Sequence, residues 1–198
     1  MTDLPSRWPL PDHGAERDAL VAAYADPERG YHDALHLTEV LDRLEELATT
    51  LTFDGTTVSL AAWWHDAFYD GERDAEERSA RWAEAALTGT PYAAEVARLV
   101  RLTEHHDPAP DDDAGQALCD ADLAILASED ERYDAYVAGV RRDYAHVSDA
   151  DFAAGRAAVL RDLLGRARLF TTAYGRERWE PRARLNLRRE LEELPRSP

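Results

Sequence analysis

Histidine and aspartate side chains occur in this chain at spacings that would allow several of them to hold one metal ion. His65 and Asp66 are adjacent in the apolar segment VSLAAWWHDAFYD, where an unpaired carboxylate would cost several kcal/mol. His32 and His36 are four residues apart, so on a helix both can project from one face. A divalent cation would neutralise Asp66, and pairing of Asp66 with an arginine is the structural alternative that spacing does not exclude. The candidate ligands are neutral imidazoles and ionised carboxylates, namely His36, His65, Asp66 and Asp122.

The segments that carry these residues are predicted to be helices. Apolar residues recur at intervals of three and four almost throughout, and runs of β-branched residues with period two are nearly absent. The predicted helices cover about 15–25, 32–48, 58–70, 75–87, 91–106, 118–128 and 180–194. Two more are expected to begin at Ser128 and Ser148, because an acidic residue follows each serine at the spacing of a capping box. The fold class is therefore predicted to be all-α.

Composition predicts one folded domain and argues against nucleic-acid polymers and membranes as partners. The 198 residues suit a single core, and 44% of them are hydrophobic. The chain has 40 acidic and 23 basic residues, a net charge of −17, so we expect no nucleic-acid polymer as a partner. No apolar leader follows Met1 and no membrane-length apolar run occurs, so we expect a cytoplasmic protein without membrane contact. Cys119 is the single cysteine and is predicted to be buried.

Several stretches of the chain together resemble the HD superfamily of metal-dependent phosphohydrolases, a helical fold named for its adjacent His-Asp pair. The chain is similar in particular to a group of small bacterial proteins described as predicted HD phosphohydrolases. The similar stretches are YHDALHLTEVL, AAWWHDAFYD, EERSA, LTEHH, LCDADLAIL, VRRDYAHV, GRAAVL and ARLNLRREL. The resemblance implies an HD-domain helical bundle of roughly eight or nine helices, with residues 1–198 forming a single domain.

Carried over residue by residue, the resemblance implies a complete set of metal ligands. His36 would be the first ligand, His65 and Asp66 the central pair, and Asp122 the last. Asp120 is the competing choice for the last position. We favour Asp122, because the last aspartate of the family usually follows an alanine and precedes an apolar run, as in ADLAIL, whereas Asp120 would orient a ligand.

The resemblance also suggests residues around the metal. His105 falls where some HD enzymes place a second-metal ligand or a phosphate-binding histidine, whereas His106 would point about 100° away on a helix and is predicted to be structural. His32 is predicted to hydrogen-bond a group next to a ligand or to be an ordinary capping histidine. A carboxylate that positions the attacking water is expected after the HD pair, with a solvated acidic helix face as the alternative. The candidates are Glu77, ranked first, and Asp70, Glu72 and Glu76. The candidate phosphate-binding arginines are Arg78, Arg141 and Arg184.

The implied reaction is hydrolysis of a small phosphorylated metabolite, with a nucleotide favoured. A divalent ion would polarise a phosphoryl oxygen and lower the pKa of a bound water from about 15.7 towards about 7. Imidazole and carboxylate ligands suit manganese, which we favour, as well as iron, cobalt, nickel, zinc or magnesium. The acidic helices are compatible with a monomer or a homodimer. Two other functions remain open: an HD-type diiron oxygenase, which would need His105 and His32 as ligands, and a non-catalytic helical protein that binds nucleotide and metal.

Overall fold

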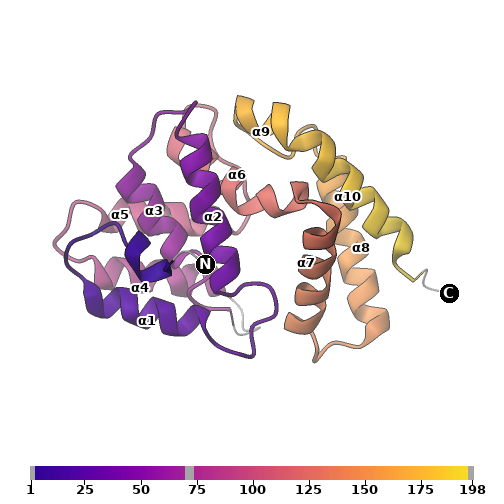
Figure 1. The fold of residues 1–198 in the computed structure, drawn as a ribbon, viewed down its shortest axis with the longest axis horizontal. Coiled ribbons are helices and arrows are strands. Elements are labelled where there is room, and N and C mark those ends of the chain that lie inside the picture. Colours follow the sequence, from indigo (N-terminus) through magenta and orange to yellow (C-terminus); the bar gives the residue numbers. More distant parts are fainter. Residues whose placement is uncertain (1–2, 70–73, 196–198) are drawn as a thin grey trace.

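The computed structural model describes residues 3–69 and 74–195, and these are folded entirely as helices, turns and loops (Figure 1). The all-α prediction is confirmed, with ten α-helices and two short 3-10 helices in the described part of the chain. In chain order they are η1 (Leu4–Arg7), α1 (Gly14–Tyr24), α2 (Ala34–Leu47), α3 (Gly55–Trp64), α4 (Ala75–Ala86), α5 (Ala93–Leu102), α6 (Asp113–Leu123), η2 (Ala124–Ala127), α7 (Asp130–Asp143), α8 (Asp149–Gly165), α9 (Ala173–Arg178) and α10 (Glu180–Glu193). Among these elements, only η1 and α9 have no counterpart in the predicted helices.

Helix starts are set mainly by side chains that accept hydrogen bonds from free backbone amides. Asp33 caps α2, Asp54 caps α3 and Ser148 caps α8, the last as predicted. Ser128 was expected to cap α7 but does not. The residue before α7 is Glu129, which makes no side-chain cap, and the Ser128 hydroxyl is buried without a partner among the described residues.

Helix α3 lies at the centre of the N-terminal helices. It packs against α2, α4, α5 and α6, and the side chains of Trp63 and Trp64 are fully buried. Trp8 from the N-terminal segment places its ring edge against both, with centroid distances of 5.2 and 5.5 Å. The predicted helix over 58–70 is therefore real but ends at Trp64, so that His65 and Asp66 lie just beyond its last turn.

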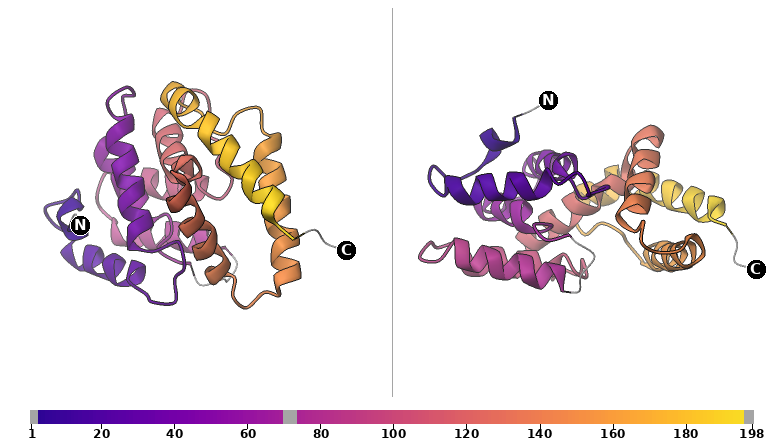
Figure 2. Two further views of the ribbon diagram at one scale, coloured as in Figure 1. Left: turned by 45° about the vertical axis from the view of Figure 1, so that its right-hand side comes forward. Right: turned by 90° about the horizontal axis from the view of Figure 1, so that it is seen from below.

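The C-terminal helices form a second group beside the first. Helix α10 packs against α8, α9 and η2, and α6 runs between the two groups of helices (Figure 1). Figure 2 shows the same division from two further directions, with indigo helices on one side and orange helices on the other. In the residues that the structure describes, no helix combines the length and apolarity needed to cross a membrane.

Candidate metal centre

Three helices bring the predicted ligands together. His36 lies in the first turn of α2, His65 caps the C-terminus of α3 with Asp66 next to it, and Asp122 lies in the last turn of α6. The two histidines are 1% exposed, while the side chains of Asp66 and Asp122 are 14% and 16% exposed. The cluster is therefore nearly buried but open to solvent on its carboxylate side.

The side-chain atoms of the cluster lie close to one another. The Nε2 atoms of His36 and His65 are 3.0 Å apart. Oδ2 of Asp66 is 3.2 Å from His36 Nε2 and 3.1 Å from His65 Nε2. Oδ1 of Asp122 is 3.3 and 3.6 Å from the same two atoms. Ligand atoms of His36, His65 and Asp66 all lie within 4.8 Å of one another, a spacing that one metal ion can bridge.

The hydrogen bonding of His65 tests whether the cluster suits a cation. Its Nδ1 is 2.7 Å from the carbonyl oxygen of Ala62, so Nδ1 carries the proton and donates it. The neutral ring then has a lone pair on Nε2, which faces the carboxylates of Asp66 and Asp122. A lone pair facing two anionic groups requires positive charge between them, either a proton on the imidazole or a metal ion. The donor set of imidazole nitrogen and carboxylate oxygen fits a divalent transition ion.

Electrostatic interactions across the cluster also favour positive charge at its centre. Burial disfavours the charged form of every member, yet the opposite charges outweigh it. The pKa of His65 is raised well above its ordinary value by Asp66 and Asp122, and that of His36 is raised by the same carboxylates. The pKa values of Asp66 and Asp122 are held well below the usual range, mainly by His65. The cluster thus demands positive charge, which a bound cation would supply in place of protons.

A buried arginine that sequence analysis did not single out fixes the backbone around the cluster. Arg29 is 7% exposed and donates to the carbonyl oxygens of His32 at 2.7 Å, Asp66 at 2.8 Å and Ala67 at 2.8 Å. The backbone amide of Asp66 donates to the Tyr24 hydroxyl at 3.2 Å. Arg29 therefore donates to the backbone carbonyl oxygen of Asp66 and does not pair with its carboxylate, which contacts the two imidazoles.

The geometry separates Asp122 from Asp120. The Asp120 carboxylate accepts hydrogen bonds from the backbone amides of Thr171 at 2.7 Å and Thr172 at 2.8 Å, and from the Thr171 hydroxyl at 3.0 Å. Burial raises its pKa although these donors oppose the rise. Asp120 thus anchors the loop before α9 and does not take the predicted role of orienting a metal ligand.

The two adjacent histidines after α5 exchange their predicted places. Helix α5 ends at Leu102, and the amides of His105 and His106 both donate to the Leu102 carbonyl oxygen in the following turn. His106 has a φ of 52°, which turns its ring towards the cluster, and its Nε2 is 2.8 Å from Asp122 Oδ2. The side chain of His105 is 76% exposed, and its ring is 3.8 Å from Glu104. The prediction that His106 points away is wrong, because α5 ends at Leu102 and His106 lies beyond the helix.

The predicted water-positioning carboxylate does not lie at the cluster. Glu77 pairs with Arg101 at 2.5 Å and with Arg81 at 2.7 Å on the surface formed by α4 and α5. The hydrogen bond from Arg101, with help from Arg81, lowers the pKa of Glu77 to about 2. The position of Glu77 corresponds to the alternative of a solvated acidic face. Asp70 and Glu72 lie outside the described residues.

Two of the three arginines predicted to bind phosphate pair with carboxylates away from the cluster. Arg141 pairs with Asp149 at 2.7 Å, and Arg184 pairs with Glu180 at 2.6 Å. The guanidinium of Arg78 lies 4.4 Å from the centroid of the Phe68 ring. The structure does not bring Arg141 or Arg184 to the cluster.

The diiron interpretation requires His32 and His105 as ligands, and the structure does not bring His105 to the cluster. His32 Nδ1 is 2.9 Å from an oxygen of Asp143, and the His32 ring stacks on Tyr69 with centroids 3.6 Å apart. His32 is thus hydrogen-bonded through Nδ1 to a carboxylate. His105 lies at the surface and is not placed as a further ligand, whereas the centroid of the His32 ring is 5.6 Å from that of His36.

Comparison of the chain with models of protein families, with curated proteins and with solved structures gives no match. The resemblance to the HD superfamily therefore stays a prediction.

Proposed function

We propose that the chain is a metal-dependent phosphohydrolase acting on a small phosphorylated metabolite, for which a nucleotide is the favoured size. The observation that carries this proposal is the convergence of two imidazoles and two carboxylates from three helices. The carboxylate oxygens of Asp66 and Asp122 each lie within 3.6 Å of both Nε2 atoms, on the side of the cluster that solvent reaches. The sequence resemblance to HD phosphohydrolases supports the same reaction.

The ligand set indicates which ions would bind and what they would contribute. Imidazole and carboxylate together suit manganese, iron, cobalt, nickel or zinc, and magnesium is compatible with the carboxylates. When bound, such an ion supplies Lewis-acid polarisation of a phosphoryl oxygen and makes water more acidic. His36, His65, Asp66 and Asp122 would hold it, and manganese remains our favoured choice.

His106 would act on the reaction by positioning Asp122. Its Nε2 hydrogen bond fixes one carboxylate oxygen of Asp122, while the other oxygen faces His36 and His65. The ring of His106 is 18% exposed and reaches solvent beside the cluster. We therefore propose that His106, and not His105, is the histidine that acts beside the cluster.

Two arginines near the cluster are paired with carboxylates. Arg132 makes two hydrogen bonds of 2.6 Å to the Glu39 carboxylate. Arg156 makes hydrogen bonds of 2.6 and 3.0 Å to the Glu190 carboxylate. In both pairs the guanidinium is neutralised by its carboxylate. Attraction of phosphate would thus depend mainly on the cation, which favours a small ester over a highly charged polymer.

The test is phosphate release by the purified chain after removal of metal with a chelator and addition of one divalent ion at a time. We expect hydrolysis of at least one member of a broad phosphomonoester panel, and its reduction to background in Asp66→Asn, which keeps the side-chain shape. His106→Ala should lower the rate about 10- to 100-fold, as loss of an outer partner of a ligand does. The matched control is His105→Ala, which should leave the rate unchanged.

Two results would contradict the proposal. If Asp66→Asn keeps the metal-dependent rate, the cluster is not the reaction centre. If no ester is hydrolysed with any ion although the chain binds metal at the cluster, the chain is a binding protein and not an enzyme.

A further inference from the structure

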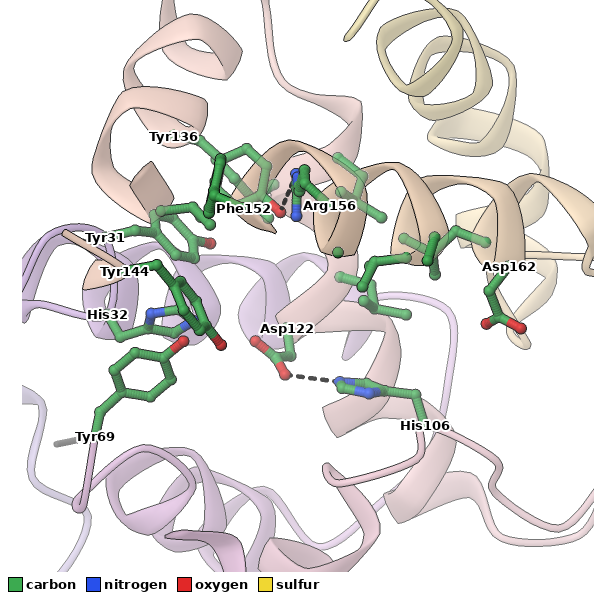
Figure 3. A pocket seen from close by; sticks show the side chains of 18 of the residues that line it. Tyr31, His32, Tyr69, His106, Asp122, Tyr136, Tyr144, Phe152, Arg156 and Asp162 are labelled. Carbon is green, nitrogen blue, oxygen red and sulfur yellow. Dashed lines mark hydrogen bonds and ion pairs between the residues drawn. The ribbon is translucent and has the colours of Figure 1, made fainter. Parts of the chain in front are cut away.

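A cavity of about 850 Å³ adjoins the candidate metal centre. In Figure 3, Asp122 and His106 lie on one side of it and the rings of Tyr31, Tyr69 and Tyr144 on another. Its volume is in the range of pockets that bind drug-sized ligands. A molecule bound at the metal centre would therefore extend into this space.

The walls of the cavity are mainly apolar and aromatic. Tyr136 and Phe152 add two more rings, and Val159 on α8 adds an aliphatic wall that is 49% exposed. Lining of this kind favours a ligand part that is itself apolar and carries a ring.

The charged residues of the cavity leave no surplus positive charge. Arg156 is bound to Glu190, and Arg166 is 3.2 Å from Asp162, which also lines the cavity. Asp151 adds a further carboxylate. A ligand part with additional phosphates would meet net negative charge there, whereas an uncharged part would not.

Tyr31 provides an independent sign that a polar ligand atom belongs at the junction of cavity and metal centre. The residue is 6% exposed and lines the cavity, and its hydroxyl is buried without a hydrogen-bond partner in the described part of the chain. Its ring lies 4.6 Å from the ring of His36. An unpaired buried hydroxyl is costly unless a ligand supplies the acceptor.

We propose that this cavity binds the leaving group of a phosphomonoester, that this group is an uncharged, ring-bearing and mainly apolar alcohol, and that Tyr31 donates a hydrogen bond to its ester oxygen. The proposal rests on the proposed phosphohydrolase function. In the reaction, a water oxygen forms a new bond to phosphorus, the ester P–O bond breaks, and the leaving oxygen takes up a proton. The products are the free alcohol, which the cavity holds, and inorganic phosphate.

The first experiment measures binding without catalysis. Metal-free protein is titrated with 1-naphthylmethanol, a ring-bearing alcohol without phosphate, and binding is followed by calorimetry. We expect saturable binding that is about tenfold weaker in Val159→Glu, which places a charge in the apolar wall. The matched control is Leu185→Glu, because Leu185 is also exposed, at 63%, but lies on α10 and is not among the lining residues. Absence of saturable binding, or equal affinity in the two variants, overturns the assignment of the cavity.

Tyr31→Phe tests the hydroxyl separately from the fold. We expect the affinity for 1-naphthylmethanol to fall about fivefold, the usual worth of one hydrogen bond. The free energy of unfolding should not fall, because the variant removes a buried hydroxyl that has no protein partner. Loss of stability with unchanged affinity would show that the hydroxyl has a structural role and would overturn the proposed hydrogen bond.

The second experiment uses metal-loaded protein and two esters of primary alcohols. The kcat/KM for benzyl phosphate should exceed that for glycerol 3-phosphate at least about tenfold, and Val159→Glu should reduce the preference. Equal values would overturn the cavity assignment while leaving the phosphohydrolase proposal intact. Binding of 1-naphthylmethanol without hydrolysis of any ester would overturn the phosphohydrolase proposal and leave the cavity as a binding site for the alcohol.

Discussion

Asp120 and Asp122 are two residues apart on α6, and their replacement should have separable effects. In Asp120→Ala the amides of Thr171 and Thr172 lose their acceptor inside the protein. An unsatisfied buried donor costs about 1–3 kcal/mol, so two cost about 2–6 kcal/mol. Burial also raises the pKa of Asp120, which shows that keeping a carboxylate there has a cost of its own, so we expect about 3 kcal/mol. For a chain of this length that corresponds to a fall in Tm of about 6–12 °C.

The affinity for Mn²⁺ should be lost in Asp122→Ala and kept in Asp120→Ala. Asp120→Ala should bind Mn²⁺ like the unmodified chain at a temperature where both are folded, because Asp120 makes its contacts at the loop before α9. Asp122→Ala should lose more affinity than the about 10- to 100-fold that an outer partner contributes.

The assay combines thermal unfolding in chelator with calorimetric titration of Mn²⁺ for both variants. An unchanged Tm in Asp120→Ala would refute the reasoning about its hydrogen bonds. Loss of Mn²⁺ binding in Asp120→Ala together with its retention in Asp122→Ala would refute the assignment of the ligand.

Three further predictions concern residues around the cluster. Asp143→Asn should lower the free energy of unfolding by about 1–3 kcal/mol at pH 7, because the Asp143 carboxylate binds His32 and two backbone amides. His32 and these amides lower the pKa of Asp143 against the effect of burial, so the stabilisation is present above the unfolded pKa near 3.8 and is lost as the pH falls through the folded value. Urea unfolding at pH 7 and pH 3 should show the difference between the two proteins shrinking, and a constant difference would contradict this. Arg29→Ala should weaken Mn²⁺ binding and lower the free energy of unfolding by about 2–4 kcal/mol, because three carbonyl oxygens lose their donor. Calorimetric titration of Mn²⁺ and urea unfolding measure the two effects, and an unchanged affinity together with an unchanged stability would contradict the prediction. Glu77→Gln should leave phosphate release unaltered, and a large loss of rate would reinstate Glu77 at the reaction centre.

Local sequence patterns were sufficient where a helix is defined by its own residues. The helix predicted over 32–48 is observed as Ala34–Leu47, because the apolar period and the capping residue Asp33 both act within one or two turns. The Ser148 cap and the burial of Cys119, 1% exposed, were predictable for the same reason.

The details of the site depend on where helices end, which the local pattern does not define. His65 and Asp66 lie past the end of α3 although the apolar run continues beyond them. His106 reaches Asp122 only because α5 ends at Leu102 and the chain adopts a positive φ at His106. That backbone conformation is unfavourable for residues other than glycine and is compensated here by a tertiary contact.

Other members of the site gave no sequence signal. Every basic residue of the chain is an arginine, so Arg29, which holds the backbone beside the cluster, was indistinguishable from surface arginines. In the sequence Tyr31 is one aromatic residue among many, and only the structure shows that its buried hydroxyl has no partner in the described residues. Both roles come from contacts between segments far apart in the chain.

The most direct measurement of the central claim is the anomalous scattering of a crystal of the chain soaked with Mn²⁺. The account predicts one strong peak in contact with the Nε2 atoms of His36 and His65 and with carboxylate oxygens of Asp66 and Asp122. A peak confined to surface residues such as His105, with the buried imidazoles contacting only protein, would contradict it.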